Sequence, residues 1–218
     1  MGKLEIVIGP MYAGKTTRLI EIYNRYKICN ISTIVVNHSS DKRYGLSDLH
    51  SHQKVKIPCI ECSDNLSKLY ETHSATVKDA KVILINEAQF FTDLHEWVKN
   101  IVETKDVDVY LFGLDADYER KEFGQIVSLI PLCDSVTKLN AMCLDCKNGT
   151  PAIFTFRTAP AVSQKFIGGK ESYKALCRKC YNGQKSREAP AKQVPVSDKE
   201  YVPYVDVEDM VVYNSMRV

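Results

Sequence analysis

The sequence predicts an α/β fold in which a mostly parallel sheet is covered by helices on both faces and is followed by a small cysteine-rich module. Three observations predict this class. Short apolar runs recur along the first 140 residues, stretches with helical spacing separate them, and cysteines arranged in pairs follow Asn140. Strands that are apolar on both faces and alternate with helices form parallel sheets buried between helical layers.

The first elements are expected in a regular order. An apolar run at residues 4–8 predicts a strand, which leads into a Gly-containing turn. A helix is predicted next, because Leu19, Ile20, Tyr23 and Lys27 recur at helical spacing. Three further apolar runs predict strands at residues 33–37, 81–86 and 107–114.

A second helix is expected between the last two of these strands. Thr92 is its expected N-cap. Its apolar face is formed by Leu94, Trp97, Val98, Ile101 and Val102. The polar segment from about 38 to 56 shows no hydrophobic period, and we expect it to be a long loop.

The chain divides into three expected parts. Residues 1–140 form the α/β domain, and residues 141–182 form the cysteine-rich module. From Gly183 to residue 218 neither a helix nor a strand period is present. We therefore expect this last part to be a disordered tail.

Composition limits the class of function. The chain has 218 residues, of which 44% are hydrophobic and 26% charged, as is typical of a globular protein. No segment approaches the roughly 20 apolar residues that span a bilayer. The first residues resemble neither a signal peptide nor a transit peptide, so we expect a cytoplasmic location. The net charge of +2 gives no indication of nucleic acid or a membrane as a partner.

A phosphate-binding loop is the strongest motif. Residues 9–16 match the pattern GxxxxGK[ST] in full, between a predicted strand and a predicted helix as the motif requires. In such a loop backbone N–H groups surround the β-phosphate of ATP, Lys15 reaches the β and γ oxygens, and the Thr16 hydroxyl coordinates Mg²⁺. A chance Gly-rich turn would not require the flanking strand and helix. The expected ATP-binding residues include Gly9, Pro10, Met11, Tyr12, Ala13, Gly14, Lys15 and Thr16.

A carboxylate follows the predicted strand 81–86. Glu87 would lie at the carboxyl end of the sheet, where open α/β sheets bind ligands. It is a candidate general base, because a hydroxyl that attacks phosphorus must lose a proton. From position alone, a solvated glutamate at the end of a strand is an equally good interpretation.

Four of the eight cysteines predict a metal centre. Disulfides are not expected in a cytosolic chain. Cys143 with Cys146, and Cys177 with Cys180, form two CxxC pairs whose thiolates would converge on one tetrahedral Zn²⁺. Such a site has no open coordination position, so the zinc would be structural.

The other cysteines are less informative. Cys59 and Cys62 form a third CxxC without a partner pair; redox and metal roles stay open for it, but two buried or idle thiols are the simpler hypothesis. Cys29 and Cys133 have apolar neighbours and are expected to pack as small hydrophobic side chains. Two histidines of the polar segment lack companion ligands and are expected to be solvated, namely His50 and His52.

Together these residues resemble the type II thymidine kinases, a family shared by animal cells, many bacteria and poxvirus-like large DNA viruses. The resemblance runs from about Leu4 to Tyr181 in the family's order. Its marks are the loop GPMYAGKTT, which extends the ATP-binding set to Thr17, the D-x-R of 41–43, the E-x-Q-F-F of 87–91, Leu114-Asp115 with Tyr118 and the RKEFG of 120–124, and the two CxxC pairs.

The resemblance implies transfer of the γ-phosphoryl group of ATP to the 5′-hydroxyl of thymidine. Glu87 would be the catalytic base, and Asp41 and Arg43 would lie near the ATP phosphates. Aromatic and apolar walls hold a flat pyrimidine well, and the residues implied for this pocket are Met11, Phe90, Leu114, Tyr118 and Phe123.

The resemblance also implies a lasso loop, tied down by the zinc, that reads the edge of thymine with backbone amides and carbonyls. Glycines would allow the backbone to approach the base closely. The implied residues are Thr155, Phe166, Ile167, Gly168, Gly169 and Tyr173. Family members are commonly homotetramers inhibited by dTTP, and both properties are expectations for this chain.

Two positions depart from the family pattern. Asn86 stands where the family usually has Asp, which puts the strength of Mg²⁺ binding in question. Tyr118 stands where Phe is common, so its hydroxyl needs a partner if it is buried.

Three alternatives remain open. One is a P-loop deoxynucleoside kinase of different or broader specificity. A zinc-ribbon NTPase that binds nucleic acid is another, against which the near-neutral charge and the lack of a basic stripe speak. The third is a catalytically inactive relative, which only Asn86 favours.

Overall fold

The main sheet of the computed structural model is parallel throughout, as the sequence predicts. The structure describes residues 1–40, 48–50, 55–159 and 172–188. Six strands follow the order β5-β2-β6-β7-β1-β8, and each pairs with its neighbours in parallel. Their bounds are β1 Leu4–Ile8, β2 Thr33–His38, β5 Ile60–Cys62, β6 Val82–Asn86, β7 Asp108–Gly113 and β8 Ser135–Lys138.

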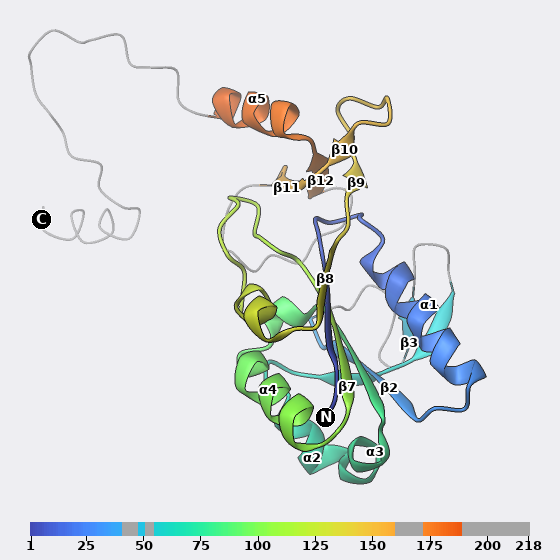
Figure 1. Cartoon of the computed structure of the whole chain (residues 1–218). Coiled ribbons are helices and arrows are strands. Elements are labelled where there is room, and N and C mark those ends of the chain that lie inside the picture. The colour runs from blue at the N-terminus through green and yellow to red at the C-terminus, as the bar shows by residue number, and fades with distance from the viewer. Residues whose placement is uncertain (41–47, 51–54, 160–171, 189–218) are drawn as a thin grey trace, which may run out of the picture. The chain divides into compact units, whose positions relative to one another are not determined.

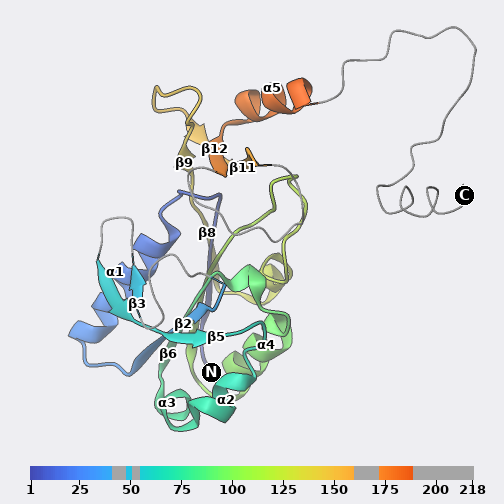
Figure 2. The ribbon, with the colours of Figure 1, turned by 180° about the vertical axis from the view of Figure 1, so that it is seen from behind.

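Helices cover both faces of this sheet (Figures 1 and 2). One face carries α1 (Lys15–Ile28), whose Leu19 and Ile20 pack in one buried cluster with Leu84 and Phe112. The other face carries α2 (Lys68–Thr72), α3 (Ser74–Asp79) and α4 (Leu94–Thr104), with the 3₁₀ turns η1 (Ala88–Phe90) and η2 (Val127–Leu132). Since successive strand residues face opposite sides, each of the four central strands β2, β6, β7 and β1 contributes to both clusters. The predicted α/β class is confirmed.

The start of α4 differs from the prediction. The N-cap is Asp93, not Thr92. The Thr92 hydroxyl donates instead to the carbonyl of Asp64 at 3.0 Å, and the Asp93 carboxylate accepts from the backbone N–H groups of Leu66 and Ser67. Both side chains hold the preceding loop against the helix, so the local capping rule gives way to tertiary contacts.

The segment predicted as a long loop contains a hairpin. Strand β3 (Asp48–His50) pairs antiparallel with β4 (Lys56–Pro58). Leu49 lies opposite Ile57, and both are buried against the α1 face of the sheet. Strand β4 has three residues, exposed, buried and exposed in turn, and is too short to produce a hydrophobic period in the sequence. The side chains of His50 and His52 lie outside the described part.

The cysteine-rich region forms two small antiparallel sheets and a helix. Strands β9 (Ala141–Met142) and β10 (Pro151–Ala152) pair, as do β11 (Phe154–Arg157) and β12 (Tyr173–Leu176). Its core is a third buried cluster, which includes Phe156, Leu176 and Tyr181. Helix α5 (Arg178–Glu188) follows.

The C-terminal boundary also differs from the prediction. One compact unit of the chain spans Met1–Gly183. Helix α5 continues to Glu188, so the predicted unstructured tail cannot begin at Gly183. Among the described residues, none of the helices has the length and apolar character required to cross a membrane.

Candidate active site and metal centre

The loop predicted to bind phosphate connects β1 to α1 at the carboxyl end of the sheet. Gly14 forms the N-cap of α1 with φ 84°, a left-handed conformation that glycine adopts without cost. The first turn of α1 contains no acidic residue, and its last turn contains Arg25 and Lys27. The positive end of the helix dipole therefore lies at the loop, and no nearby carboxylate of the first turn cancels it. Such a helix end favours a bound anion.

Lys15 lies over this loop. Its ammonium donates to the carbonyl of Gly9 at 2.9 Å and to that of Pro10 at 2.8 Å. The side chain thus folds back from the first turn of the helix to the loop it is predicted to serve. A cation held at this place is within reach of oxygens bound by the loop.

Two of the residues implied for thymine recognition contact the same loop. The Thr155 hydroxyl accepts from the backbone N–H of Met11 at 3.0 Å. The hydroxyl of Tyr12 donates to the carbonyl of Tyr173 at 3.4 Å. Strands β11 and β12 are therefore bound to the β1–α1 loop, and residues far apart in sequence come together.

Glu87 sits directly beyond β6 in a left-handed conformation, with φ 52°. For a residue other than glycine this conformation is uncommon and is maintained only by its surroundings. Its carboxylate accepts from the Gln89 amide at 2.8 Å. The carbonyl oxygen of that amide accepts from the backbone N–H of Leu114 at 3.0 Å. Glu87 is thereby held toward the end of β7.

Gln89 is a site residue that the sequence reasoning did not assign. It is 2% exposed, and each end of its carboxamide is used. A Cβ atom on Gly124 would lie 2.0 Å from the backbone carbonyl oxygen of Gln89, so position 124 requires glycine. The signal that could have revealed it is the glutamine in the E-x-Q-F-F pattern, which no local rule interprets.

Asn86 lies at the last position of β6 and is buried. Its amide nitrogen donates to the Asn37 side-chain oxygen at 2.8 Å. The two residues are paired in register across β2 and β6. One donor of the amide is therefore used inside the sheet, and its oxygen is the atom that remains for a metal-bound water.

Aromatic side chains gather next to Glu87. The rings of Phe90 and Phe123 meet edge to face with centroids 5.4 Å apart, and His38 packs on Phe90 at 5.1 Å. Phe123 is buried, whereas Phe90, Leu114 and Tyr118 are half-buried. The Arg157 guanidinium lies 5.1 Å from the centre of the Tyr118 ring. Arg157 is a further residue that the sequence analysis missed.

The remaining predicted site residues are not tested by the geometry. Asp41 and Arg43 lie outside the described residues, as do Phe166, Ile167, Gly168 and Gly169. Thr16 and Thr17 occupy the first turn of α1 and are half-buried. Their roles toward ATP and Mg²⁺ stay predictions.

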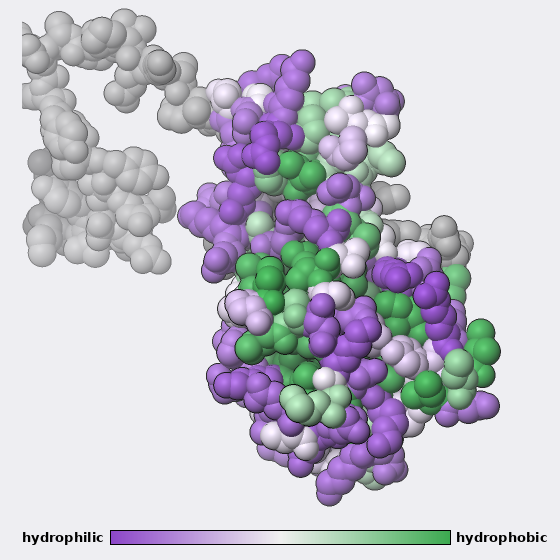
Figure 3. Space-filling model, in the orientation of Figure 1, coloured by the Kyte–Doolittle hydropathy of each residue, from purple (hydrophilic) through white to green (hydrophobic). Residues whose placement is uncertain are grey.

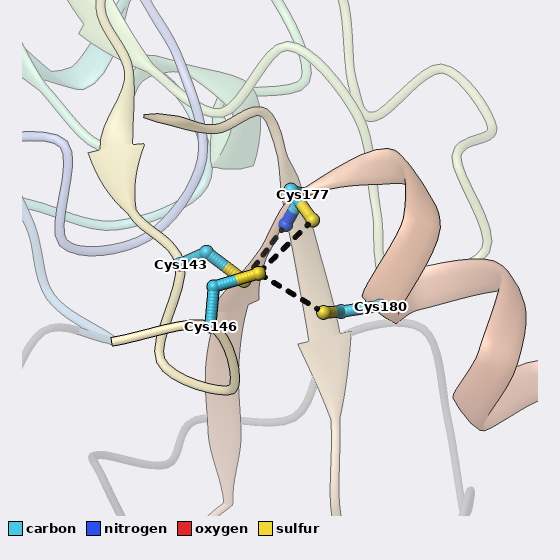
Figure 4. Close-up of side chains that lie close together, drawn as sticks. All are labelled: Cys143, Cys146, Cys177 and Cys180. Atoms are coloured by element: carbon cyan, nitrogen blue, oxygen red, sulfur yellow. Dashed lines mark hydrogen bonds between the residues drawn. The ribbon is translucent and has the colours of Figure 1, made fainter. Parts of the chain in front are cut away.

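Four cysteines converge as their spacing predicts (Figure 4). Cys143 and Cys146 follow β9, Cys177 follows β12, and Cys180 lies on α5. Their sulfur atoms all lie within 4.8 Å of one another, with Cys146 Sγ 3.4 Å from Cys180 Sγ and 3.8 Å from Cys177 Sγ. Four thiolates at about 2.3 Å from a tetrahedral Zn²⁺ would be separated by roughly 3.8 Å.

The electrostatic surroundings favour a thiolate at one of these positions. Burial raises the pKa of the Cys143 thiol, but hydrogen bonds from backbone N–H groups, that of Cys177 above all, outweigh it and bring the pKa to about 6. The Cys177 N–H lies 3.3 Å from the Cys143 sulfur. Metal-binding cysteines must be deprotonated. The backbone favours that form at Cys143, whereas the hydrogen bond with Cys146 raises the pKa of the Cys180 thiol.

For the other four cysteines, the structure confirms some of the predicted packing and corrects the rest. Cys133 packs against the main core, as predicted. Cys29 is exposed, so its predicted packing is wrong: it lies at the C-cap of α1, where the helix ends at the surface. Cys62 is buried in one core cluster while Cys59 packs against the cluster on the other face of the sheet. This arrangement supports two separate thiols.

Fold and site define a class: α/β proteins with a parallel sheet, a glycine-containing loop that leads into the first helix, and a four-cysteine centre. The sequence matches the family described as thymidine kinase over residues 2–181. The chain therefore belongs to the thymidine kinase family, a family of kinases.

Curated relatives agree with this assignment. A thymidine kinase of Rabbit fibroma virus (strain Kasza) is 37% identical over 181 residues, which cover 83% of this chain and 96% of the relative. A thymidine kinase of Sheeppox virus (strain KS-1) is 37% identical over 180 residues, covering 83% and 97%. One from Oryza sativa subsp. japonica is 36% identical over 181 residues, covering 83% and 66%.

Proposed function

We propose that the protein transfers the γ-phosphoryl group of ATP to the 5′-hydroxyl of thymidine. The observation that carries the proposal is the placement of Glu87. Its carboxylate accepts from Gln89 directly beyond β6, at the same carboxyl end of the sheet as the β1–α1 loop, and Phe90, close by in the chain, packs on Phe123. A base at the sheet edge that also carries a phosphate loop and apolar rings supports this transfer.

The reaction can be written with these residues. The 5′-oxygen of thymidine attacks the γ-phosphorus, its proton passes to the Glu87 carboxylate, and the bond between the γ-phosphorus and the β–γ bridging oxygen breaks to release ADP. Lys15 stabilises the charge that develops on the phosphate oxygens. Met11, Leu114, Tyr118, Thr155 and Tyr173 would hold the nucleoside, together with the predicted residues outside the described part.

Two metals are part of the proposal. Mg²⁺ would be held by the Thr16 hydroxyl and by phosphate oxygens, and Asn86 offers a neutral oxygen rather than a carboxylate. When bound, Mg²⁺ neutralises charge on the β- and γ-phosphates. Zn²⁺ would be held by the four thiolates, whose closeness supports a closed structural site.

Assembly and regulation are further expectations. We propose a cytoplasmic homotetramer that dTTP inhibits. The edge strand β8 is exposed along its whole length, and apolar side chains gather over η2 and this edge (Figure 3). Exposed edges of this kind favour pairing with another chain. The exposed apolar residues there are Ile130, Leu132 and Val136.

The test is a phosphorylation assay with purified protein, labelled ATP and Mg²⁺. The acceptors are thymidine, deoxyuridine, deoxycytidine and deoxyguanosine at equal concentration. We expect dTMP as the main product, and no product with Lys15→Ala. Preferential phosphorylation of another nucleoside would assign a different specificity, and labelled phosphate released without any nucleoside product would refute the transfer.

A further inference from the structure

The turn that carries Tyr118 is held together by hydrogen bonds among its own residues, 117–121. Asp117 is buried, and its carboxylate accepts from the N–H groups of Glu119 and Lys121 at 2.8 and 2.9 Å. The Asp117 N–H donates to the carbonyl of Lys121 at 2.9 Å. Arg120 completes the turn with φ 68°. Because the turn is closed on itself, its position depends on what it contacts outside.

One outside contact comes from the residue that follows the last zinc ligand. Tyr181 is next to Cys180 on α5 and is 1% exposed. Its hydroxyl donates to the backbone carbonyl of Tyr118 at 2.6 Å. Its ring packs on Phe154 and Phe156, with centroids 5.2 and 5.7 Å away. The cysteine-rich module therefore binds the backbone of Tyr118 directly.

Arg120 makes the reverse contact from the turn to the module. Its guanidinium lies 4.6 Å from the centre of the Tyr181 ring and 5.3 Å from that of Phe154. It also donates to the Asn182 side-chain oxygen at 3.3 Å. A planar cation that lies over aromatic rings stabilises such a contact. Together with the Tyr181 hydroxyl, it joins turn and module at two points.

We propose that Tyr181 and Arg120 are positioning residues that fix the Tyr118 turn onto the zinc-binding module. This inference rests on the proposed function, in which Tyr118 lines the thymidine pocket. Nucleoside binding then depends on the module through this contact, in addition to any contribution from residues 160–171. Neither residue touches the reacting atoms, so both act on binding rather than on phosphoryl transfer.

Tyr181→Phe tests the contact with little risk to the fold, because it keeps the ring that packs in the module and removes the hydroxyl. A hydrogen bond of this kind contributes about 1 kcal/mol, equivalent to about fivefold in affinity. We expect the KM for thymidine to rise about fivefold, with kcat and the KM for ATP within twofold of wild type. The matched control is Tyr26→Phe, which removes a hydrogen-bonded hydroxyl near the C-terminal end of α1, outside the turn and the module; it should leave both KM values unchanged.

A double-mutant cycle separates positioning from general stabilisation. If Tyr181 acts through the Tyr118 side chain, Tyr181→Phe should have no further effect on the thymidine KM in a Tyr118→Ala background. An equal effect in both backgrounds would overturn the proposal, as would an unchanged KM or loss of zinc from the Phe variant. Arg120→Lys, which keeps the charge but not the planar stacking, should behave like Tyr181→Phe.

A second readout needs no catalysis. Trypsin cleaves after Arg120 and Lys121, both of which lie in the turn. We expect faster cleavage there in Tyr181→Phe than in wild type and in the Tyr26→Phe control, because the turn loses its outside contact. Equal cleavage of the three proteins would refute the positioning role, whatever the enzyme phosphorylates. Failure of the wild type to phosphorylate thymidine would refute the proposed function and leave the cleavage result to stand by itself.

Discussion

At the scale of single residues, Glu87 makes the sharpest prediction. Glu87→Gln keeps the size of the side chain and removes the proton acceptor, so kcat should fall by about 10²-fold or more while thymidine affinity stays nearly the same. Initial rates and equilibrium binding measure the two effects separately. The matched control is Glu103→Gln on the exposed side of α4, which should match wild type. A Glu87→Gln enzyme with a normal kcat would remove Glu87 from the mechanism.

Cys62 gives a second prediction at this scale. Burial, reinforced by the charge of Asp93, raises the pKa of its thiol to about 11. At pH 8 about one molecule in a thousand carries the thiolate, which is the reactive form. Iodoacetamide should therefore label exposed Cys29 well before Cys62, as peptide mass spectrometry can show. Rapid labelling of Cys62, or a disulfide between Cys59 and Cys62 under mild oxidant, would contradict the picture of two separate thiols.

The residues predicted correctly are those whose signal is local. The spacing of Cys143, Cys146, Cys177 and Cys180 contains the information that brings them together, because each CxxC pair places two thiols side by side. Gln89 shows the opposite case. Its two partners are Glu87, close in sequence, and the N–H of Leu114, which directly follows strand β7. No pattern within one segment could have predicted that second partner.

At the scale of secondary-structure elements, the pairing of β2 with β6 predicts the behaviour of position 86. Asn86→Asp replaces the amide that donates to Asn37 with a carboxylate, so two oxygens face each other in a buried place. Loss of a buried hydrogen bond costs about 1–3 kcal/mol. The variant should unfold at a lower denaturant concentration than wild type. Asn37→Asp is the matched control, because the Asn86 donor then still faces an oxygen.

The Asn37→Asp variant should be the more stable of the two. Equal stability would mean that the amide of Asn37 rotates to donate, and the hydrogen bond would then not fix the orientation of Asn86.

A magnesium titration of activity adds an independent measurement. A carboxylate at position 86 should lower the Mg²⁺ concentration needed for half-maximal rate, because it attracts the cation by about 1 kcal/mol or more. Superimposed titrations would show that position 86 does not act on the metal.

The elements that sequence could predict are those with a continuous pattern. β1, β2, β6 and β7 are buried on both faces, so their apolar runs are unbroken and mark the central strands of the sheet. β8 is exposed at every position and β5 is only three residues long, and neither was predicted. The hairpin of β3 and β4 contains a buried pair, Leu49 and Ile57, that comes from two very short strands. Edge elements of this kind are stabilised by tertiary contacts that leave little trace in local composition.

At the scale of the whole molecule, the three buried clusters make zinc removal a test of how the parts depend on each other. The third cluster, around Tyr181, is separate from the two clusters that enclose the main sheet, but Tyr12 and Ala13 of the β1–α1 loop pack against it. Loss of the metal should therefore disturb the module and the loop without unfolding the sheet. Metal analysis should find one zinc per chain through the four clustered cysteines.

A single tryptophan allows the two responses to be observed separately. Trp97 is the one tryptophan of the chain and is buried in the core of the sheet, away from the cysteine cluster. On addition of a strong chelator we expect zinc release and a fall in thymidine affinity, while the Trp97 emission stays that of the folded protein. The control is the Cys59→Ala/Cys62→Ala variant, which should retain its zinc and respond in the same way. A shift of Trp97 emission in step with zinc release would show that the sheet depends on the metal, and zinc lost from the control would show that the third CxxC pair holds it.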